Sequence, residues 1–231
     1  MQSLTRGRNV DQIVVADLAL AYNTQLDSQI LNGSGASGQH LGTFVNTGIS
    51  TVAYTNTAPT AATTYSAIWN ALSTSASAAF ERAANAIVMH PRRWASLAAY
   101  LSSNQSLISI QNAGVTQAGS QNGSVYGIVG TLGGYPVIAD ANIATVRNDS
   151  WSGSTLTRAA TGGNQDAIAV VNTNEMHLWE DPNAPLLIRA EQTSAASLGV
   201  LLVVYGLTAF ANRYPTAQVG VFGTGLATPS F

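Results

Sequence analysis

The sequence predicts an α+β fold, in which one long helix near the N-terminus is followed by short strands and two shorter helices. Apolar residues recur every four positions between Val10 and Ile30, a spacing that helices produce. Later apolar runs are short and bounded by turn-forming residues, which is typical of strands. A chain of 231 residues suits one large domain or two closely joined ones. It can bury enough surface to form a core without disulfides.

The N-terminal pattern predicts a helix over residues 11–31. Steps of four residues drift by about 40° around a helix, so the apolar stripe winds and would contact different partners along its length. Asn32 and Gly33 are residues that end helices. The segment 33–38 matches G-x-G-x-x-G, but a dinucleotide site needs a preceding strand and a helix precedes here. We therefore expect a flexible turn, followed by an extended segment over 41–53.

The rest of the chain predicts two further helices and a set of strands. One helix covers residues 65–78, with Ile68 and Leu72 facing inward, and the other covers 92–101 after Pro91, since proline is tolerated in a first turn. Strands are predicted for residues 86–90, 125–129, 135–139, 167–171, 175–180, 186–190, 198–211 and 217–222. Loops are predicted for the polar segments 55–64, 102–123 and 147–164. The run 200–205 is apolar throughout, which predicts burial of both strand faces.

The chain carries unusually little charge. Only 9% of its residues are charged, its net charge is −2, and arginine alone makes up its nine basic residues. No basic stripe of the kind that binds nucleic acid is visible. A weakly charged surface gives poor solubility to a free monomer, which favours a surface covered by neighbours. Residues 1–8 lack an apolar signal core, and the apolar run 198–211 is too short to predict a membrane span.

Residues that carry chemistry are few and scattered. His40, His90 and His177 lie far apart and lack zinc-site spacing, and His90 is predicted to be a loop residue beside a helix start. The adjacent pair Glu180-Asp181 points in opposite directions on an extended segment. No P-loop or G-x-S-x-G elbow occurs. We expect no catalytic, cofactor-binding or metal-binding residue, although a Ser-His-Asp triad from distant positions would leave no local pattern.

Arg92-Arg93 is the densest basic feature. The pair has two interpretations: a contact with nucleic acid or with an acidic neighbour, or a solvated helix start. Among the aromatic residues, Trp94 is predicted to lie in the core with Leu97 and Leu101. Trp179 is predicted on a strand, in the core or at an interface.

Three motifs follow one another along the chain: a long helix that ends in a glycine-rich turn, a strand followed by His-Pro-Arg and a helix, and a strand with the pattern Gly-Tyr-Pro-Val. They belong to a set of segments at residues 26–42, 86–94, 132–140, 167–180, 188–211 and 214–217. Taken in order, these segments resemble the tailed-phage major capsid protein family and its Hong Kong 97 fold. Together they span most of the chain.

The resemblance implies a structural, non-enzymatic subunit of an icosahedral shell that encloses a phage genome. The long helix would be the spine of a peripheral domain formed by residues 1–43 and 184–212. An axial domain would comprise residues 44–183 and 213–231. Partners would be identical copies in noncovalent pentamers and hexamers, with scaffold, portal or decoration proteins also possible. Packaged DNA would be contacted only non-specifically, no membrane is expected, and the virion would assemble in the host cytoplasm.

The sequence differs from the family pattern in two ways. About ten residues precede the predicted spine helix, so we expect the N-terminal arm and the extended loop of the family to be missing, either because the sequence is a fragment or because the subunit is shorter. Some members crosslink a lysine to an asparagine, but this chain has no lysine, and residues 197–199 hold no asparagine. Two alternatives remain: an encapsulin-like nanocompartment, which shares the fold, and a secreted adhesin, which the long first helix disfavours.

Overall fold

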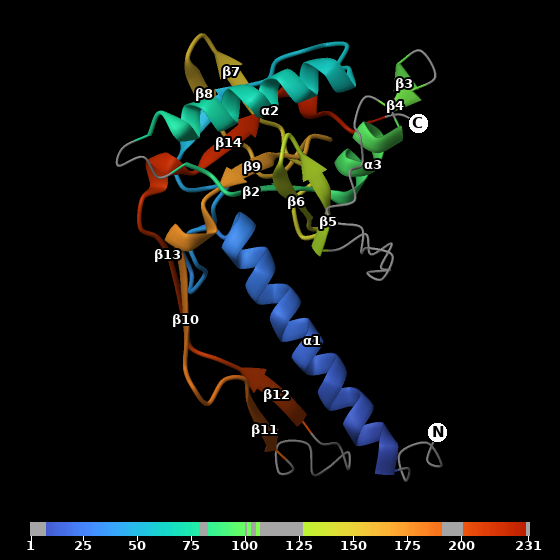
Figure 1. Ribbon diagram of the computed structural model, residues 1–231. Coiled ribbons are helices and arrows are strands. Elements are labelled where there is room, and N and C mark those ends of the chain that lie inside the picture. The colour runs from blue at the N-terminus through green and yellow to red at the C-terminus, as the bar shows by residue number, and fades with distance from the viewer. Residues whose placement is uncertain are drawn as a thin grey trace.

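The computed structural model describes residues 8–78, 83–99, 101–102, 105–106, 127–190 and 201–229. It is a mixed helix and sheet structure with two parts (Figure 1). The part that we call the body is built on a six-stranded sheet. The part that we call the arm consists of the long helix α1 and the strands β10 to β13. Figure 1 shows α1 and these strands extending from the same side of the body.

The sheet of the body has the order β1-β14-β9-β2-β6-β5. Its strands are β1 (Ser50–Ala53), β14 (Val219–Phe222), β9 (Ile168–Val171), β2 (Ala86–Met89), β6 (Tyr135–Ala139) and β5 (Gly127–Leu132). The pairs β1–β14 and β2–β6 are parallel, and the other neighbours are antiparallel. The three strands β14, β9 and β2 are buried at every position, which explains their continuous apolar sequences.

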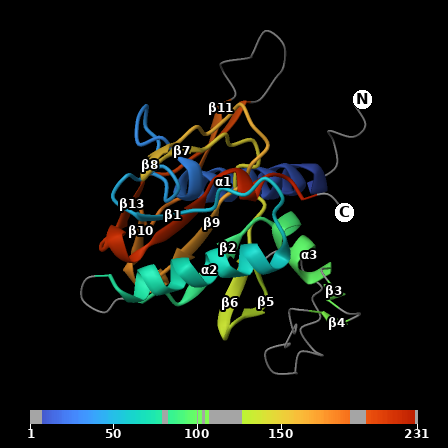
Figure 2. The ribbon, with the colours of Figure 1, turned by 90° about the horizontal axis from the view of Figure 1, so that it is seen from above.

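Two layers cover the sheet. On one face lie the helices α2 (Ala61–Ala76) and α3 (Pro91–Ala99), whose Ile68, Leu72 and Leu97 pack in a shared core. On the other face a second cluster includes Leu31 and Phe44, beside the hairpin of β7 (Ser150–Ser152) and β8 (Thr155–Thr157). Figure 2 shows α2 and this hairpin on opposite sides of the sheet. Short elements complete the fold: β3 (Leu101–Ser102), β4 (Gln105–Ser106), η3 (Thr173–Glu175), η5 (Pro215–Ala217) and η6 (Thr224–Leu226).

The arm is held together by pairing of strands that are distant in sequence. Its elements are α1 (Arg8–Asn32), β10 (Met176–Glu180), β11 (Leu186–Ala190), β12 (Leu201–Tyr205) and β13 (Thr208–Asn212). The strand β10 pairs antiparallel with β13, and β11 pairs antiparallel with β12. Tyr22 Oη on α1 donates a hydrogen bond of 2.8 Å to Glu180 Oε1, and His40 Nε2 lies 2.7 Å from Thr208 Oγ1. These contacts tie the helix and its following turn to the ribbon.

The end of α1 is fastened to the body by a polar junction. Asn32 Nδ2 donates to the backbone oxygen of Asn142 at 2.7 Å, and Asn142 Nδ2 donates to Asp27 Oδ2 at 2.6 Å. Asp140 accepts the backbone N–H of Asn142 at 2.8 Å and lies beside Asp27. Burial, and then the Asp27 carboxylate, raise the pKa of Asp140 to about 6. The Asp140 carboxyl is therefore protonated in the folded state under mildly acidic conditions.

The structure confirms most predicted elements and corrects several. The apolar run 198–211 does not form one strand: β12 and β13 are separated at Gly206, where a side chain would collide with Tyr22. Nor is the run 200–205 buried on both faces, because alternate residues of β12 are exposed. Within residues 41–53, Leu41 forms an isolated bridge with Ser34, and only β1 forms a strand.

Three loop and helix boundaries also differ from the sequence-based expectation. The helix α2 begins inside the predicted loop 55–64, because Thr60 and Thr63 form a reciprocal capping box. The predicted loop 147–164 contains the hairpin β7–β8. Leu101 lies in β3 and not in the preceding helix. Most of the predicted loop 102–123 and the first seven residues lie outside the described residues.

Candidate functional site

The Arg92-Arg93 pair lies at the corner between β2 and α3 and is bound to an acidic partner within the chain. Arg93 is 3% exposed, and its Nη2 donates to Asp166 Oδ1 at 3.0 Å. The same nitrogen donates to the backbone oxygens of Leu226 and Ala227 at 2.6 and 2.8 Å. Arg92 Nε donates to Asp166 Oδ2 at 3.2 Å. The interpretation of a solvated helix start is therefore wrong, and the pair fastens the C-terminal segment to the body.

The three histidines do not come together. His90 caps the corner before α3, since its Nδ1 accepts the backbone N–H of Arg92 at 3.1 Å. Burial and the nearby Arg92 charge lower the pKa of His90, which favours the neutral ring that can accept this bond. His40 contacts Thr208, and the ring of His177 lies 5.6 Å from that of Trp179. The predicted loop position of His90 at a helix start is confirmed.

The polar groups offer no metal centre where side chains are described. Within that part of the chain, no three residues among the histidines and acidic residues are grouped so that they could hold a metal ion. Likewise, no helix of the described segments has the length and hydropathy needed to cross a membrane. Glu180 and Asp181 contact different groups. Glu180 accepts a hydrogen bond from Tyr22, and Asp181 Oδ1 accepts one from the backbone N–H of Asn183.

One face of the hairpin β11–β12 is apolar and open to solvent. Directly paired residues of an antiparallel ribbon share a face, and residues two apart along each strand do so too. The pairs Leu186–Tyr205 and Ile188–Val203 therefore lie on one face, and Leu201 lies on the same side. These five side chains are exposed by 36% to 47%. We call Leu186, Ile188, Leu201, Val203 and Tyr205 the arm apolar face.

Further apolar side chains are exposed along the arm. Leu178 and Trp179 on β10 are 43% and 56% exposed. This exposure excludes the core interpretation of Trp179, and its place at an interface stays a prediction. Trp94, in contrast, packs against the core of the body, as expected. On α1, whose predicted stripe winds around the helix, exposed apolar residues include Ile13, Val14, Val15 and Leu20.

Such an arrangement is typical of a surface that is covered by another protein. Soluble monomers seldom expose several large apolar side chains side by side, and larger patches mark interaction sites. A two-stranded hairpin is also marginally stable by itself, so packing against a neighbour would stabilise it. Composition predicted a covered surface, but the particular residues could be identified only from strand pairing. The candidate functional site of this chain is therefore a contact surface on the arm.

Comparison with known proteins identifies the family of the chain. The model of the phage capsid family matches residues 5–181, which is most of the chain, and the chain belongs to that family. It is a structural capsid protein, a component of the virion. No curated protein matches the chain.

Solved structures of capsids share its fold. The capsid of an empty GTA particle, computed with C5 symmetry, has a TM-score of 0.58 at 15% identity, covering 96% of this chain and 69% of that chain. A structure of Gordonia phage Cozz has a TM-score of 0.56 at 16% identity, covering 96% of this chain and 65% of that one. The chain thus spans about two thirds of the length of these relatives. The Hong Kong 97-like fold that the sequence predicts is confirmed.

Proposed function

We propose that this chain is the structural subunit of an icosahedral phage shell, that it encloses the genome, and that it assembles noncovalently into pentamers and hexamers. The observation that carries the proposal is the arm apolar face, on a fold shared with capsid proteins. Full burial of a large aliphatic side chain contributes about 1.5–3 kcal/mol. Each side chain of this face still exposes a third to a half of its surface. Covering all five would therefore contribute several kcal/mol per subunit.

We propose a division into a peripheral and an axial domain, and the arrangement of the structure in an arm and a body supports it. Residues 1–43 and 184–212 would form the peripheral domain, with α1 as its spine. Residues 44–183 and 213–231 would form the axial domain around the six-stranded sheet. The pairing of β10 with β13 would join residues 176–180 of the axial domain to the strands of the peripheral domain. In this arrangement the arm apolar face is presented by the peripheral domain.

The proposal includes an inert, non-catalytic role and assembly in the bacterial cytoplasm. Support comes from the family and from the scattered chemistry-bearing side chains of the described segments. A fluorophosphonate probe should label no unique serine, and specific labelling of one serine would contradict this role. An encapsulin-like nanocompartment would share the fold, but the match to the phage capsid model supports a phage shell.

Electron microscopy tests the proposed assembly directly. We expect the purified chain to form rings or hollow particles in negative stain as protein concentration rises. High salt should not disperse them, because apolar contacts are not screened by ions. Monomers at every concentration and salt condition would contradict the proposal.

A further inference from the structure

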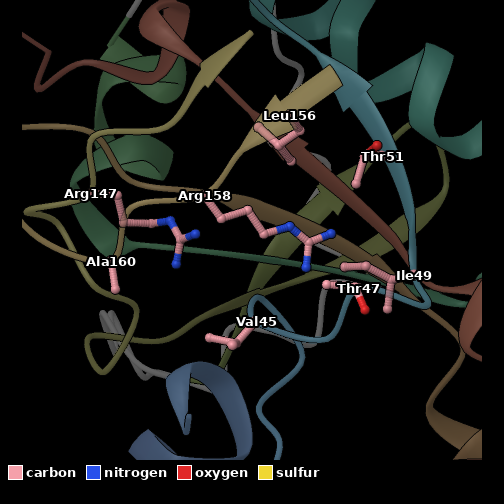
Figure 3. Close-up of a pocket in the computed structure, with 8 residues that line it drawn as sticks. All are labelled: Val45, Thr47, Ile49, Thr51, Arg147, Leu156, Arg158 and Ala160. Atoms are coloured by element: carbon pink, nitrogen blue, oxygen red, sulfur yellow. The ribbon is translucent and has the colours of Figure 1, made fainter. Parts of the chain in front are cut away.

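A cavity of about 410 Å³ lies in the body, beside the hairpin β7–β8 (Figure 3). Val45, Ile49 and Leu156 form its apolar walls, and Thr47 and Thr51 contribute hydroxyl groups. Two arginines, Arg147 and Arg158, reach into the middle of this ring of residues, with Leu156 and Thr51 on one side of them and Val45 on the other.

The deeper arginine is held in a rigid, buried position. Arg147 is 1% exposed, and its Nε and Nη2 donate to the two oxygens of Asp149 at 2.7 and 3.0 Å. Its Nη1 is buried, and no described group accepts a hydrogen bond from it. Asp149 is fixed in turn by the backbone N–H of Ala159 at 3.0 Å. The guanidinium of Arg147 also lies 5.2 Å from the centre of the Phe222 ring.

The outer arginine is half-buried and only partly satisfied. Arg158 Nη1 donates to the backbone oxygen of Asn46 at 2.5 Å. No hydrogen bond to a described residue engages its Nε or Nη2. Its guanidinium lies 5.2 Å from the centre of the same Phe222 ring. Within the described part of the chain, Asp149 is the one carboxylate among the charged groups that act on it. Burial, and then the Arg147 charge, lower the pKa of Arg158.

The cavity therefore holds two cations against one carboxylate, which leaves a net charge of about +1 in a half-buried place. Holding an uncompensated cation there costs free energy that a bound anion would recover. A guanidinium fork with two free donors matches a carboxylate or a phosphate group. One net positive charge suits a carboxylate better than a doubly charged phosphate. The apolar walls suit the aliphatic stem of an acidic side chain and not a sugar-phosphate chain.

We propose that this cavity is a carboxylate-binding site for one acidic side chain from a neighbouring protein chain. Arg158 donates hydrogen bonds to the carboxylate, and the charge of Arg147 stabilises it. The site lies on the body, apart from the arm apolar face, and its occupation does not depend on how the arm associates. Because the cavity volume far exceeds that of one carboxylate group, it accommodates the stem of the side chain as well.

Binding of a blocked amino acid to the full-length chain tests the ligand chemistry. We expect N-acetylglutamate amide to bind with a dissociation constant on the order of 1 mM, measured by calorimetry or NMR titration. N-acetylglutamine amide is the neutral control and should bind at least about tenfold more weakly. Equal binding of the two compounds would overturn the proposal. Tighter binding of inorganic phosphate or of a short oligodeoxynucleotide would overturn the choice of carboxylate.

Two arginine variants assign this binding to the cavity. Arg158→Gln should weaken the binding of N-acetylglutamate amide about tenfold or more. Arg213→Gln is the matched control, since Arg213 is exposed and stacks on Tyr214, 5.1 Å from the ring centre. It removes the same charge from a different place and should leave binding unchanged. If both variants weaken binding equally, the binding is non-specific attraction and the site is refuted.

A second pair of variants avoids reliance on an arginine that also supports the fold. Leu156 and Arg158 lie two residues apart on an extended segment and share a face. Leu156→Glu should place a carboxylate inside the cavity. Leu156→Gln places an uncharged amide of nearly the same shape there. Both lose the packing of Leu156, so their difference isolates the charge. We expect the Glu variant to melt about 3 °C higher than the Gln variant. A Glu variant that melts at or below the Gln variant would refute the site.

Discussion

The body and the arm differ in which side chains they bury and which they expose. In the body, even the charged side chains Arg93 and Asp166 are buried and bonded to one another. In the arm, the apolar face of β11–β12 stays open to solvent. The body therefore has the packing of a self-sufficient domain, whereas no described residue of the arm covers the arm apolar face. We infer that the arm reaches its most stable state only when a neighbouring subunit covers it.

Removing a buried charge should produce the largest change in stability. Arg93→Ala leaves Asp166 buried with only the weaker contact of Arg92, and we expect a loss of about 3–5 kcal/mol in the free energy of unfolding. Denaturant unfolding followed by circular dichroism measures it. The adjacent Arg92→Ala is the control, because the Arg92 side chain is 20% exposed. It should cost less than Arg93→Ala, because Asp166 then keeps its closer contact with Arg93. Equal losses would show that the corner is not a buried ion pair.

This burial was not predictable from the sequence. Arg93 looks like a solvated helix residue until Asp166, 73 positions away, is brought beside it by the pairing of β2 with β9. The helix α1 and the central strands were predictable, because their apolar spacing is local. The predicted burial of both strand faces at residues 200–205 was wrong. An apolar sequence indicates burial, but whether a strand is buried depends on what covers it. In this subunit, nothing described covers one face of β12.

The next largest difference in stability should come from truncating one apolar side chain in the body and one in the arm. Ile68→Ala in α2 removes a fully buried side chain and should cost about 2–5 kcal/mol in unfolding free energy. Leu201→Ala in the arm removes a side chain that is 47% exposed. Measured on dispersed subunits, it should cost less than about 1 kcal/mol, because little of its surface is withdrawn from water. A loss at Leu201 as large as that at Ile68 would contradict the proposed openness of the arm.

The polar junction between arm and body should make stability depend on pH, with a smaller effect than the substitutions above. The pKa of Asp140 is about 6 in the folded chain, against an ordinary value of 3.8. Between these values the folded state holds a proton that the unfolded state has released, so the contribution of Asp140 to stability is most favourable below this window and falls as the pH rises through it. Asp140→Asn should remove that fall and melt higher than the wild type at pH 7. Thermal melts from pH 4 to 7 measure it.

A matched control separates this effect from the loss of charge alone. Asp17→Asn removes an exposed carboxylate from the same helix that carries Asp27. It should retain the wild-type dependence of melting temperature on pH. If Asp140→Asn retains that dependence too, the Asp140 carboxyl is not the group that titrates at the junction.

The arm apolar face is the central claim, and assembly of a charged variant tests it most directly. Ile188→Asp places a carboxylate in the middle of the face, and Thr155→Asp places the same charge on an exposed position of β8 in the body. Sedimentation velocity should show that Thr155→Asp assembles like the wild type. Ile188→Asp should sediment as dispersed subunits with unchanged circular dichroism. Normal assembly of Ile188→Asp at wild-type concentrations would contradict the claim that this face joins subunits.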